Sequence, residues 1–416
     1  MKRLSFKTFI RPLCIALLTK TLMIVLPAIL LVVSQSAVRY PYLSYSHVLG
    51  SIGIMDYSDK TTPLTDKYGN KYTTAEADSL MPLSNFRQLM MDGRMPDSIA
   101  GQEATMRNIA SRQIVVRHTP SDGMSTQPPL HLLYENMPKR VGIELPTDMI
   151  RLSGELTFID CATLRTNGNK SDIFTRALQK SGFVFPVRAS WSNDSPRKRY
   201  DEGIFCSDAR GELYHLKMVN GRPFVRHVPM PTGFVLADVS IAEPSDKSFY
   251  AIAYSTNGCM GLIAQDENSE SGYSVSLFDL APVNLLTDRI TFSGNLVSWT
   301  LTVVNETGVS AWAFDRQTLA PLDTLTLVAP QPTTLESACA ALLPLSFGKS
   351  YVAGGDEVAN VKIGPTIAWL IAIVLACVYY FWRGRRKGSE GLWGTLLVAL
   401  TGPCGLIAAL LIPQDY

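Results

Sequence analysis

The stretch Arg383-Gly-Arg-Arg-Lys-Gly-Ser-Glu390 decides how the chain is organised. It lies between two apolar runs, residues 363–382 and 391–413, and about 20 apolar residues are enough to cross a bilayer as a helix. A short basic linker between two spans is typical of the cytoplasmic side of a membrane. The sequence therefore predicts two C-terminal transmembrane helices joined by a cytoplasmic linker at residues 383–390.

The N-terminus predicts a third transmembrane helix. Residues 1–12 are basic and are expected in the cytoplasm, and an apolar segment follows at residues 13–38. An uncleaved anchor is favoured over a cleaved signal peptide, and both place residue 40 onward beyond the membrane. Lys20 interrupts the apolar run and is expected to face a partner helix or to reach toward the headgroups. The residues that determine this topology are Lys2, Arg3, Lys7, Arg11, Arg383, Arg385, Arg386 and Lys387.

Composition excludes some function classes. The 416 residues include 38 basic and 36 acidic residues without a long basic stripe, so a dedicated nucleic-acid binder is not expected. Cys161, Cys206, Cys259 and Cys339 are widely spaced and form no Cys-x-x-Cys pair, so no zinc site or other cofactor is expected. Whether these cysteines form disulfides stays open.

Residues 39–149 form a mixed α/β segment. Thr73-Thr-Ala-Glu76 has the pattern of a capping box, which opens a helix. Apolar positions recur from Leu80 to Met90, and Gly93 is placed as the C-terminal cap. The sequence predicts one helix from residue 74 to that glycine.

Residues 150–360 predict a strand-rich region with three hairpins. Asn220-Gly221 is a strong turn signal that pairs Val219 with Arg222 and Tyr214 with His227. Asn257-Gly258 is expected to set Thr256 opposite Cys259, and a third turn is expected at residues 305–308. A helix is predicted at residues 170–181.

Four phenylalanines suggest a repeat in this region. Phe158, Phe205, Phe249 and Phe292 occur every 43 to 47 residues, which is the period of a four-stranded propeller blade. The predicted fold class is a mainly β extracytoplasmic domain, propeller-like, with a few helices and three transmembrane helices. The alternatives are another all-β sheet domain, such as a sandwich, or a mixed α/β domain.

Candidate catalytic and metal-binding residues are few. The hairpin register places His215 and His227 on opposite faces of their sheet, so they cannot share a metal ion. Asp201-Glu202 is interpreted as a solvated charged turn, because adjacent strand residues point to opposite faces. No nucleophile motif or phosphate-binding glycine loop is present in the sequence. No catalytic residue is therefore assigned.

Aromatic and arginine side chains gather in one part of the strand-rich region. Such residues are enriched at protein interfaces, although aromatics in a sheet also build cores. The predicted interaction surface consists of Trp191, Arg197, Arg199, Tyr200 and Tyr214.

Three stretches, at residues 158–167, 171–186 and 201–218, resemble an uncharacterised family of bacterial inner-membrane proteins. The resemblance implies one N-terminal span, an extracytoplasmic domain and two C-terminal spans. It also implies genes beside ABC-transporter components, and hence an accessory role. It assigns no functional residue.

These observations predict a membrane-anchored extracytoplasmic binding or accessory protein in the inner (cytoplasmic) membrane, and no catalytic activity is inferred for it. Its N-terminus would be cytoplasmic and its C-terminus extracytoplasmic. The expected partners are the lipid bilayer and a membrane protein such as a transporter permease. The alternative is a carbohydrate- or peptide-hydrolysing enzyme, which requires carboxylates that meet in one cleft. The candidates for this cleft are Asp160, Asp201, Glu202 and Asp208.

Overall fold

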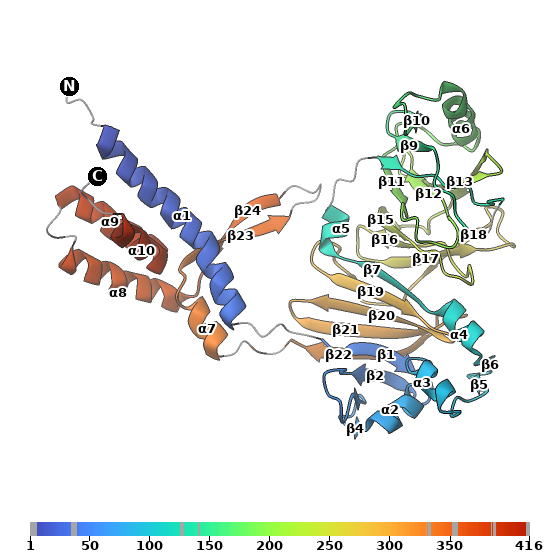
Figure 1. Ribbon diagram of the computed structural model, residues 1–416, viewed down its shortest axis with the longest axis horizontal. Coiled ribbons are helices and arrows are strands. Elements are labelled where there is room, and N and C mark those ends of the chain that lie inside the picture. The colour runs from blue at the N-terminus through green and yellow to red at the C-terminus, as the bar shows by residue number, and fades with distance from the viewer. Residues whose placement is uncertain are drawn as a thin grey trace. The chain divides into compact units, whose positions relative to one another are not determined.

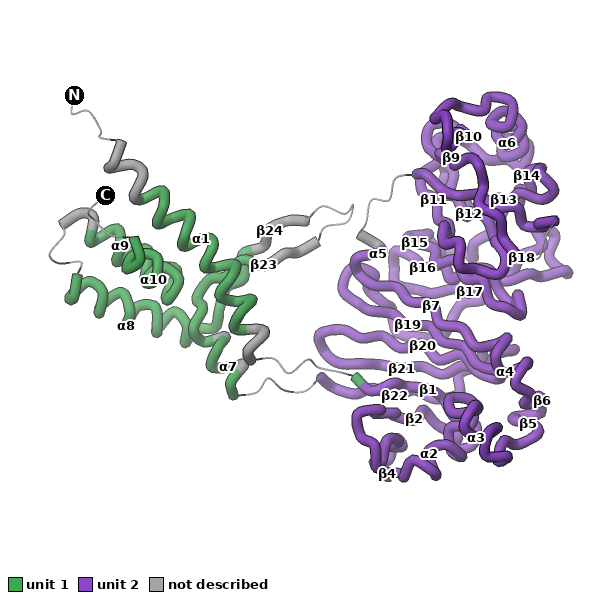
Figure 2. The backbone as a smooth tube through the Cα atoms, in the orientation of Figure 1, with its two compact units in different colours: residues 1–40, 330–416 green, residues 41–329 purple. Residues whose placement is uncertain are grey.

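The chain is divided into two compact units. The computed structural model describes residues 6–34, 40–124, 129–139, 142–329, 331, 334–351, 357–383, 385 and 388–412. One unit comprises residues 1–40 and 330–416, and the other comprises residues 41–329 (Figure 2). The larger unit is strand-rich, and the smaller one is mainly helical (Figure 1).

The larger unit consists of successive antiparallel sheets in which neighbouring strands follow one another along the chain. The first sheet has β1 (Tyr42–Ser46), β2 (Ser51–Met55), β3 (Leu64–Thr65) and β4 (Lys71–Tyr72). The second has β8 (Leu130–His131), β9 (Asp148–Leu152) and β10 (Leu156–Asp160). The third has β11 (Ala189–Ser192), β12 (Ile204–Ser207), β13 (Leu213–Val219) and β14 (Arg222–Val228).

Two further sheets complete this unit. The fourth has β15 (Leu236–Ile241), β16 (Ala251–Ser255), β17 (Met260–Gln265) and β18 (Tyr273–Leu277). The fifth has β19 (Arg289–Gly294), β20 (Ser298–Asn305), β21 (Gly308–Asp315) and β22 (Pro321–Val328), with β7 (Ile114–His118) added beside β19. A ribbon of β5 (Ser98–Ile99) and β6 (Gln102–Glu103) is separate. The helices are α2 (Thr74–Leu80), α3 (Phe86–Met91), α4 (Met106–Arg112), α5 (Pro120–Met124) and α6 (Gly168–Lys180).

From the second sheet to the fifth, consecutive sheets pack face to face. Because strand side chains alternate between faces, β12 directs Ile204 and Cys206 toward the core shared with α6 and β10, and Phe205 toward the β15–β18 sheet. On the other side of that sheet, Tyr254 packs in one core with Phe292. The sheets between the two ends of this series therefore have apolar residues on both faces.

The early part of the chain is built into the same unit as the late strands. β7 pairs with β19, from Ile114 opposite Gly294 to His118 opposite Ile290. The backbone N–H of Tyr45 in β1 also donates to Thr300 Oγ1 in β20 at 3.3 Å. The described residues between 41 and 149 thus belong to the same compact unit as the strand-rich region that follows.

The predicted Asn220-Gly221 hairpin is confirmed. Val219 lies opposite Arg222 and Tyr214 lies opposite His227. Asn220 and Gly221 have φ values of +50° and +73°, as a two-residue type I′ turn requires. The third hairpin is confirmed as well, since Asn305 pairs with Gly308. The predicted helix at residues 170–181 is present as α6.

The predicted register at Asn257-Gly258 is wrong by one residue. Tyr254 pairs with Met260 rather than with Gly261, and the loop has three residues between Ser255 and Cys259. Gly258 has a φ of +84°, and Asn257 is not among the described residues with positive φ. A three-residue loop with one left-handed glycine therefore replaces the two-residue turn.

The predicted single helix from residue 74 to Gly93 is divided. Its capping box is present, with Thr73 and Glu76 bonded as predicted. However, α2 ends at Leu80 and α3 begins only at Phe86, so the apolar residues Leu83 and Phe86 reach a different core from that of Ala77. The break lets one segment cover two adjoining apolar surfaces.

The smaller unit contains α1 (Phe6–Ser34), α7 (Thr334–Ala340), α8 (Thr366–Trp382), α9 (Gly388–Thr401) and α10 (Pro403–Leu411). A hairpin of β23 (Leu345–Tyr351) and β24 (Glu357–Ile363) precedes α8. Within the described residues, one helical segment, Pro12–Leu30 of α1, is long and apolar enough to cross a membrane.

The prediction of a continuous third span at residues 391–413 is wrong. The chain reverses at Gly402, whose φ is +60°, and Pro403 starts α10. A Cβ on Gly405 would lie 2.9 Å from the carbonyl oxygen of Leu397, whereas residues eight apart in a straight helix are about 12 Å apart. The helices α9 and α10 therefore fold back on each other. The preceding predicted span, residues 363–382, begins later than predicted, because Ile363 belongs to β24.

Phe292 tests the packing between the last two sheets. It is fully buried, and its ring lies 5.9 Å, centroid to centroid, from that of Phe249, just before β16 of the fourth sheet. We expect Phe292→Ala to lower the free energy of unfolding by about 3–5 kcal/mol, because a large cavity replaces the ring. The measurement is the urea concentration at which the buried Cys206 thiol becomes reactive. The control, Tyr68→Ala, removes an exposed ring and should change stability by less than about 0.5 kcal/mol; equal effects would refute this packing.

Candidate functional site

The structure overturns the interpretation of Asp201-Glu202 as a solvated turn. Asp201 is 1% exposed and Glu202 is 3% exposed. The turn that carries them precedes β12 and needs Gly203, whose φ is +77° and whose added Cβ would lie 2.3 Å from the Leu216 carbonyl oxygen. The backbone therefore directs two adjacent carboxylates into the interior between the β11–β14 and β15–β18 sheets.

Lys198 is the cation that pairs with the first carboxylate. Its Nζ contacts Asp201 Oδ1 and lies 3.1 Å from Oε1 of Glu243, which follows β15. Both lysine and glutamate side chains are about 95% buried, with 4% and 5% exposed. Asn193 Nδ2 donates to Glu243 Oε2 at 2.6 Å, which fixes the glutamate further. This group links the β11–β14 sheet to the segment after β15.

Glu202 belongs to a second, adjoining group. Its Oε2 contacts Lys217 Nζ from β13, and its backbone carbonyl contacts Nε2 of His215. His215 is fully buried, and its Nδ1 lies 2.8 Å from the Tyr273 hydroxyl in β18. Burial lowers the pKa of His215 well below its usual value, so this histidine is neutral at pH 7.

The two groups contain more carboxylates than cations. Among the described residues, Lys198 and Lys217 are the cations that form ion pairs with Asp201, Glu202 and Glu243, and Lys247 acts on Glu202 from farther away. Burial raises the pKa of Asp201 to about 6, although Lys198 opposes this effect. Asp201 Oδ2 has no hydrogen-bond partner among the described residues. A proton on the carboxyl group of Asp201 would balance the negative charge that the two lysines leave.

The four candidate carboxylates do not meet in one cleft. Asp208 follows β12 while Asp201 precedes it, and this strand alone spans roughly 13 Å. Asp208 accepts hydrogen bonds from the backbone N–H groups of Arg210 and Glu212 at 2.8 and 3.0 Å. Asp160 caps its own turn by accepting from Thr163 N at 2.7 Å. The cleft that the hydrolase alternative requires is therefore not formed by these four carboxylates.

The described histidines also form no metal site. The partly exposed His227 lies 2.8 Å from Glu212 and opposite Tyr214, whereas His215 is buried on the other face of the sheet, as the hairpin register predicts. Across the described residues, no group of three or more His, Cys, Asp or Glu side chains has the geometry of a metal site.

The predicted interaction surface is only partly exposed. Arg197 and Arg199 are exposed, while Trp191 donates from Nε1 to Asp238 Oδ1 at 2.6 Å and Tyr200 donates to the Pro244 carbonyl at 2.7 Å. Tyr214 is 2% exposed and packs in the core against Phe183. Tyr214 is thus a core residue, because the alternation of side chains along the strand directs its ring inward.

The predicted topology residues are described incompletely. Arg383 caps the end of α8, and Arg385 is exposed. Lys7 and Arg11 lie in α1, but their side chains are outside the described set. The others, Lys2, Arg3, Arg386 and Lys387, lie outside the described residues.

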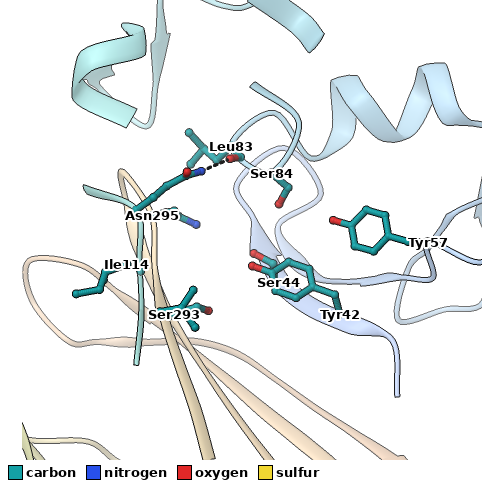
Figure 3. A pocket seen from close by; sticks show the side chains of 11 residues that line it. Tyr42, Ser44, Tyr57, Leu83, Ser84, Ile114, Ser293 and Asn295 are labelled. Atoms are coloured by element: carbon teal, nitrogen blue, oxygen red, sulfur yellow. Dashed lines mark hydrogen bonds between the residues drawn. The ribbon is translucent and has the colours of Figure 1, made fainter. Parts of the chain in front are cut away.

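A pocket that sequence reasoning missed lies between β1, the α2–α3 connection and the β7–β19 pair. Its volume is about 300 Å³, at the lower end for small-molecule sites. Figure 3 shows Tyr42 and Tyr57 on one side, with Ile114, Ser293 and Asn295 on the other. The lining residues are Tyr42, Ser44, Tyr57, Leu83, Ser84, Gln113, Ile114, Val115, Ser293, Gly294 and Asn295.

The pocket is neutral and polar. The ring centroids of Tyr42 and Tyr57 are 6.4 Å apart, and Gln113 Nε2 donates to the Leu83 carbonyl at 3.1 Å. None of the lining side chains is a carboxylate, an amine or a guanidinium. Aromatic faces beside hydroxyl and amide groups suit an uncharged polar ligand and supply no acid or base for hydrolysis.

The Lys198 group can be tested by removing its cation. Lys198→Met leaves Asp201 and Glu243 buried without their counter-charge, and we expect a loss of about 3–5 kcal/mol in stability. The exposed neighbour provides a control, since Arg197→Met should change stability by less than about 0.5 kcal/mol. Both are measured by the urea dependence of Cys206 reactivity. A Lys198→Met variant as stable as the control would show that the group contributes nothing.

The pKa of Asp201 predicts a pH dependence with a definite sign. Between about pH 4, the usual carboxyl pKa, and pH 6, the unfolded chain releases a proton that folded Asp201 retains. Wild type should therefore lose about 3 kcal/mol relative to Asp201→Asn as the pH rises through this window. Urea midpoints of both proteins are compared at the same pH, at several pH values. A difference that does not vary with pH would contradict the raised pKa.

The chain was compared with curated proteins, with solved structures and with models of protein families. No curated protein matches the sequence. Among solved structures, dihydro-heme d1 dehydrogenase NirN in complex with DHE is similar over 61% of this chain and 72% of that chain, with 10% identity and a TM-score of 0.22. That likeness is too low to support an inference about this chain.

A family model described as a domain of unknown function, DUF4857, matches residues 42–314. This confirms the expectation of an uncharacterised family, and it carries no information on membrane topology or neighbouring genes. Because the match spans more than half of the 416 residues, the chain belongs to the DUF4857 family.

Proposed function

We propose that this protein is a membrane-anchored binding or accessory protein without catalytic activity. Its strand-rich unit lies on the extracytoplasmic side, and its helical unit lies in the cytoplasmic membrane. The proposal extends to a membrane partner such as an ABC-transporter permease. It rests mainly on one observation: the apolar helix α8 buries small side chains and exposes large apolar ones.

Burial on α8 is the reverse of that on a water-soluble helix. Ala368 and Ala372 are fully buried against the other helices, whereas Leu370 is 59% and Val374 is 61% exposed. In water, large apolar side chains face inward and small or polar ones outward. Packing small residues between helices while presenting large apolar residues outward is what lipid-embedded helices do. Hydrocarbon around the helices accounts for this pattern.

The helix lengths support a modified topology. α1 has 29 residues and contains the segment that is long enough to cross, whereas α8 has 17 residues, which is the lower limit for a crossing. α9 and α10 have 14 and 9 residues and fold back on each other, so we propose that they enter and leave the membrane on the linker side. Backbone that turns within a membrane is tolerated where protein covers it, and a Cβ on Gly402 would meet Pro344 at 2.8 Å.

The larger unit supplies the binding part of the proposal. The uncharged pocket beside Tyr42 and Tyr57 is the proposed ligand site, and exposed Arg197 and Arg199 remain a proposed contact with a partner. We also propose that the sheets are blades of a propeller-like arrangement. Their sequential antiparallel order and face-to-face packing support this, together with the four buried phenylalanines at blade spacing.

Two native cysteines test membrane insertion. Cys377 on α8 and Cys161 in the larger unit are both exposed in the structure. In variants that retain only one cysteine, we expect a water-soluble maleimide to label Cys161 in sealed membranes and to leave Cys377 at least tenfold less labelled. Hydrocarbon suppresses the thiolate that reacts. Equal labelling would show that α8 lies in water.

Sidedness and partnership need separate measurements. An impermeant maleimide should reach Cys161 in intact spheroplasts if the larger unit is extracytoplasmic. Purification in mild detergent should recover a defined membrane partner in fixed proportion. A stable monomer without partner would count against the accessory role, while leaving the anchoring intact.

A further inference from the structure

Lys20 lies at the midpoint of the apolar segment of α1. It is eight residues after Pro12 and ten before Leu30, which corresponds to about 12 Å and 15 Å along the helix axis. Its side chain is exposed, and among the described residues no carboxylate pairs with it. Lys20 is the charged residue in a segment that is otherwise uncharged, and its side chain is exposed at the middle of that segment.

Neither the headgroups nor any described residue of this chain provides a counter-charge for Lys20. Its four-carbon stem is too short to cover either distance to the membrane surface, so snorkelling does not hydrate the ammonium fully. The apolar stretches at residues 13–33, 366–382 and 391–412 contain no Asp or Glu. A second copy of the chain would place another Lys20 there, and like charges repel. The counter-charge must come from a different protein.

The surroundings of Lys20 fit a helix. Leu13, Leu17, Lys20 and Ile24 follow a spacing of four, three and four residues, which places them on one stripe of the helix. The three apolar members are 47–57% exposed. Thr19 and Met23, in contrast, are buried on another side of α1. The stripe is therefore distinct from the surface that packs within this unit.

We propose that a membrane helix of a partner protein docks along this stripe and pairs an Asp or Glu near mid-membrane with Lys20. The inference rests on the proposed membrane insertion of α1 and specifies the chemistry of the partner. Charges within membranes are costly, and they occur almost always where they pair or line a polar cavity. The heptad-like spacing supplies the apolar contacts on either side of the ion pair.

Photocrosslinking in native membranes tests the stripe. A benzophenone amino acid replaces Leu17 on the stripe or, as a control, Val25, which is also exposed but lies about 80° away from Leu17 around the helix. We expect an adduct from position 17 only, containing a membrane segment with an Asp or Glu. An adduct by itself is not support. No adduct, an adduct with a second copy, or a segment without an acidic residue would overturn the proposal.

Substitutions at Lys20 then separate charge from packing. Lys20→Leu should reduce the adduct at least tenfold, and Lys20→Arg should retain it. Lys20→Glu should lose it and recover it when the partner's acidic residue is changed to lysine. An adduct unaffected by Lys20→Leu would overturn the ion pair. The labelling of Cys377 is measured in the same membranes. If Cys377 is protected but the adduct does not depend on Lys20, only this inference is refuted. If Cys377 is labelled, the membrane assignment itself is refuted.

Discussion

The strand-rich unit depends on one constraint: a sheet packed between two others must bury both of its faces. This is why β12 is apolar at adjacent positions, with Ile204 directed one way and Phe205 the other. The same constraint leaves no aqueous surface for polar groups that fall between sheets. Asp201, Glu202 and Glu243 are therefore paired with Lys198 and Lys217 inside the fold, and a proton on Asp201 balances the third carboxylate. The ionic groups are a consequence of the layered packing and hold adjoining sheets in register.

Features of the fold that depend on neighbouring residues, such as tight turns, could be predicted from the sequence. The Asn220-Gly221 turn set its hairpin register correctly, because both residues tolerate positive φ and few other turns fit. The Asn257-Gly258 turn has the same two residues, yet Ser255 Oγ donates to Asn257 Oδ1 and accepts from the backbone N–H of Cys259, and these bonds select a three-residue turn. The dipeptide alone does not distinguish the two cases.

The site could not be predicted, because its partners are distant in sequence. Glu243 completes the buried ionic group by pairing with Lys198, which also contacts Asp201. The sequence near residue 201 gives no sign of this distant partner. Likewise, the lining of the pocket comes from segments near residues 42, 57, 84, 113 and 294, which only the pairing of β7 with β19 brings together. The reversal at Gly402 escaped detection because a Gly-Pro pair is compatible with a kinked span as well as with a turn.

The pairing of β7 with β19 also has a consequence for folding. β7 is made early, but the strand that covers its edge follows only after three further sheets. During synthesis this edge stays open while the intervening sheets assemble, since each of those is built from neighbouring strands. Such long-range pairing is slow, and unpaired edges are prone to aggregation. We infer that closing the last sheet limits the folding rate and that the open β7 edge is the point at which a chaperone would protect the nascent chain.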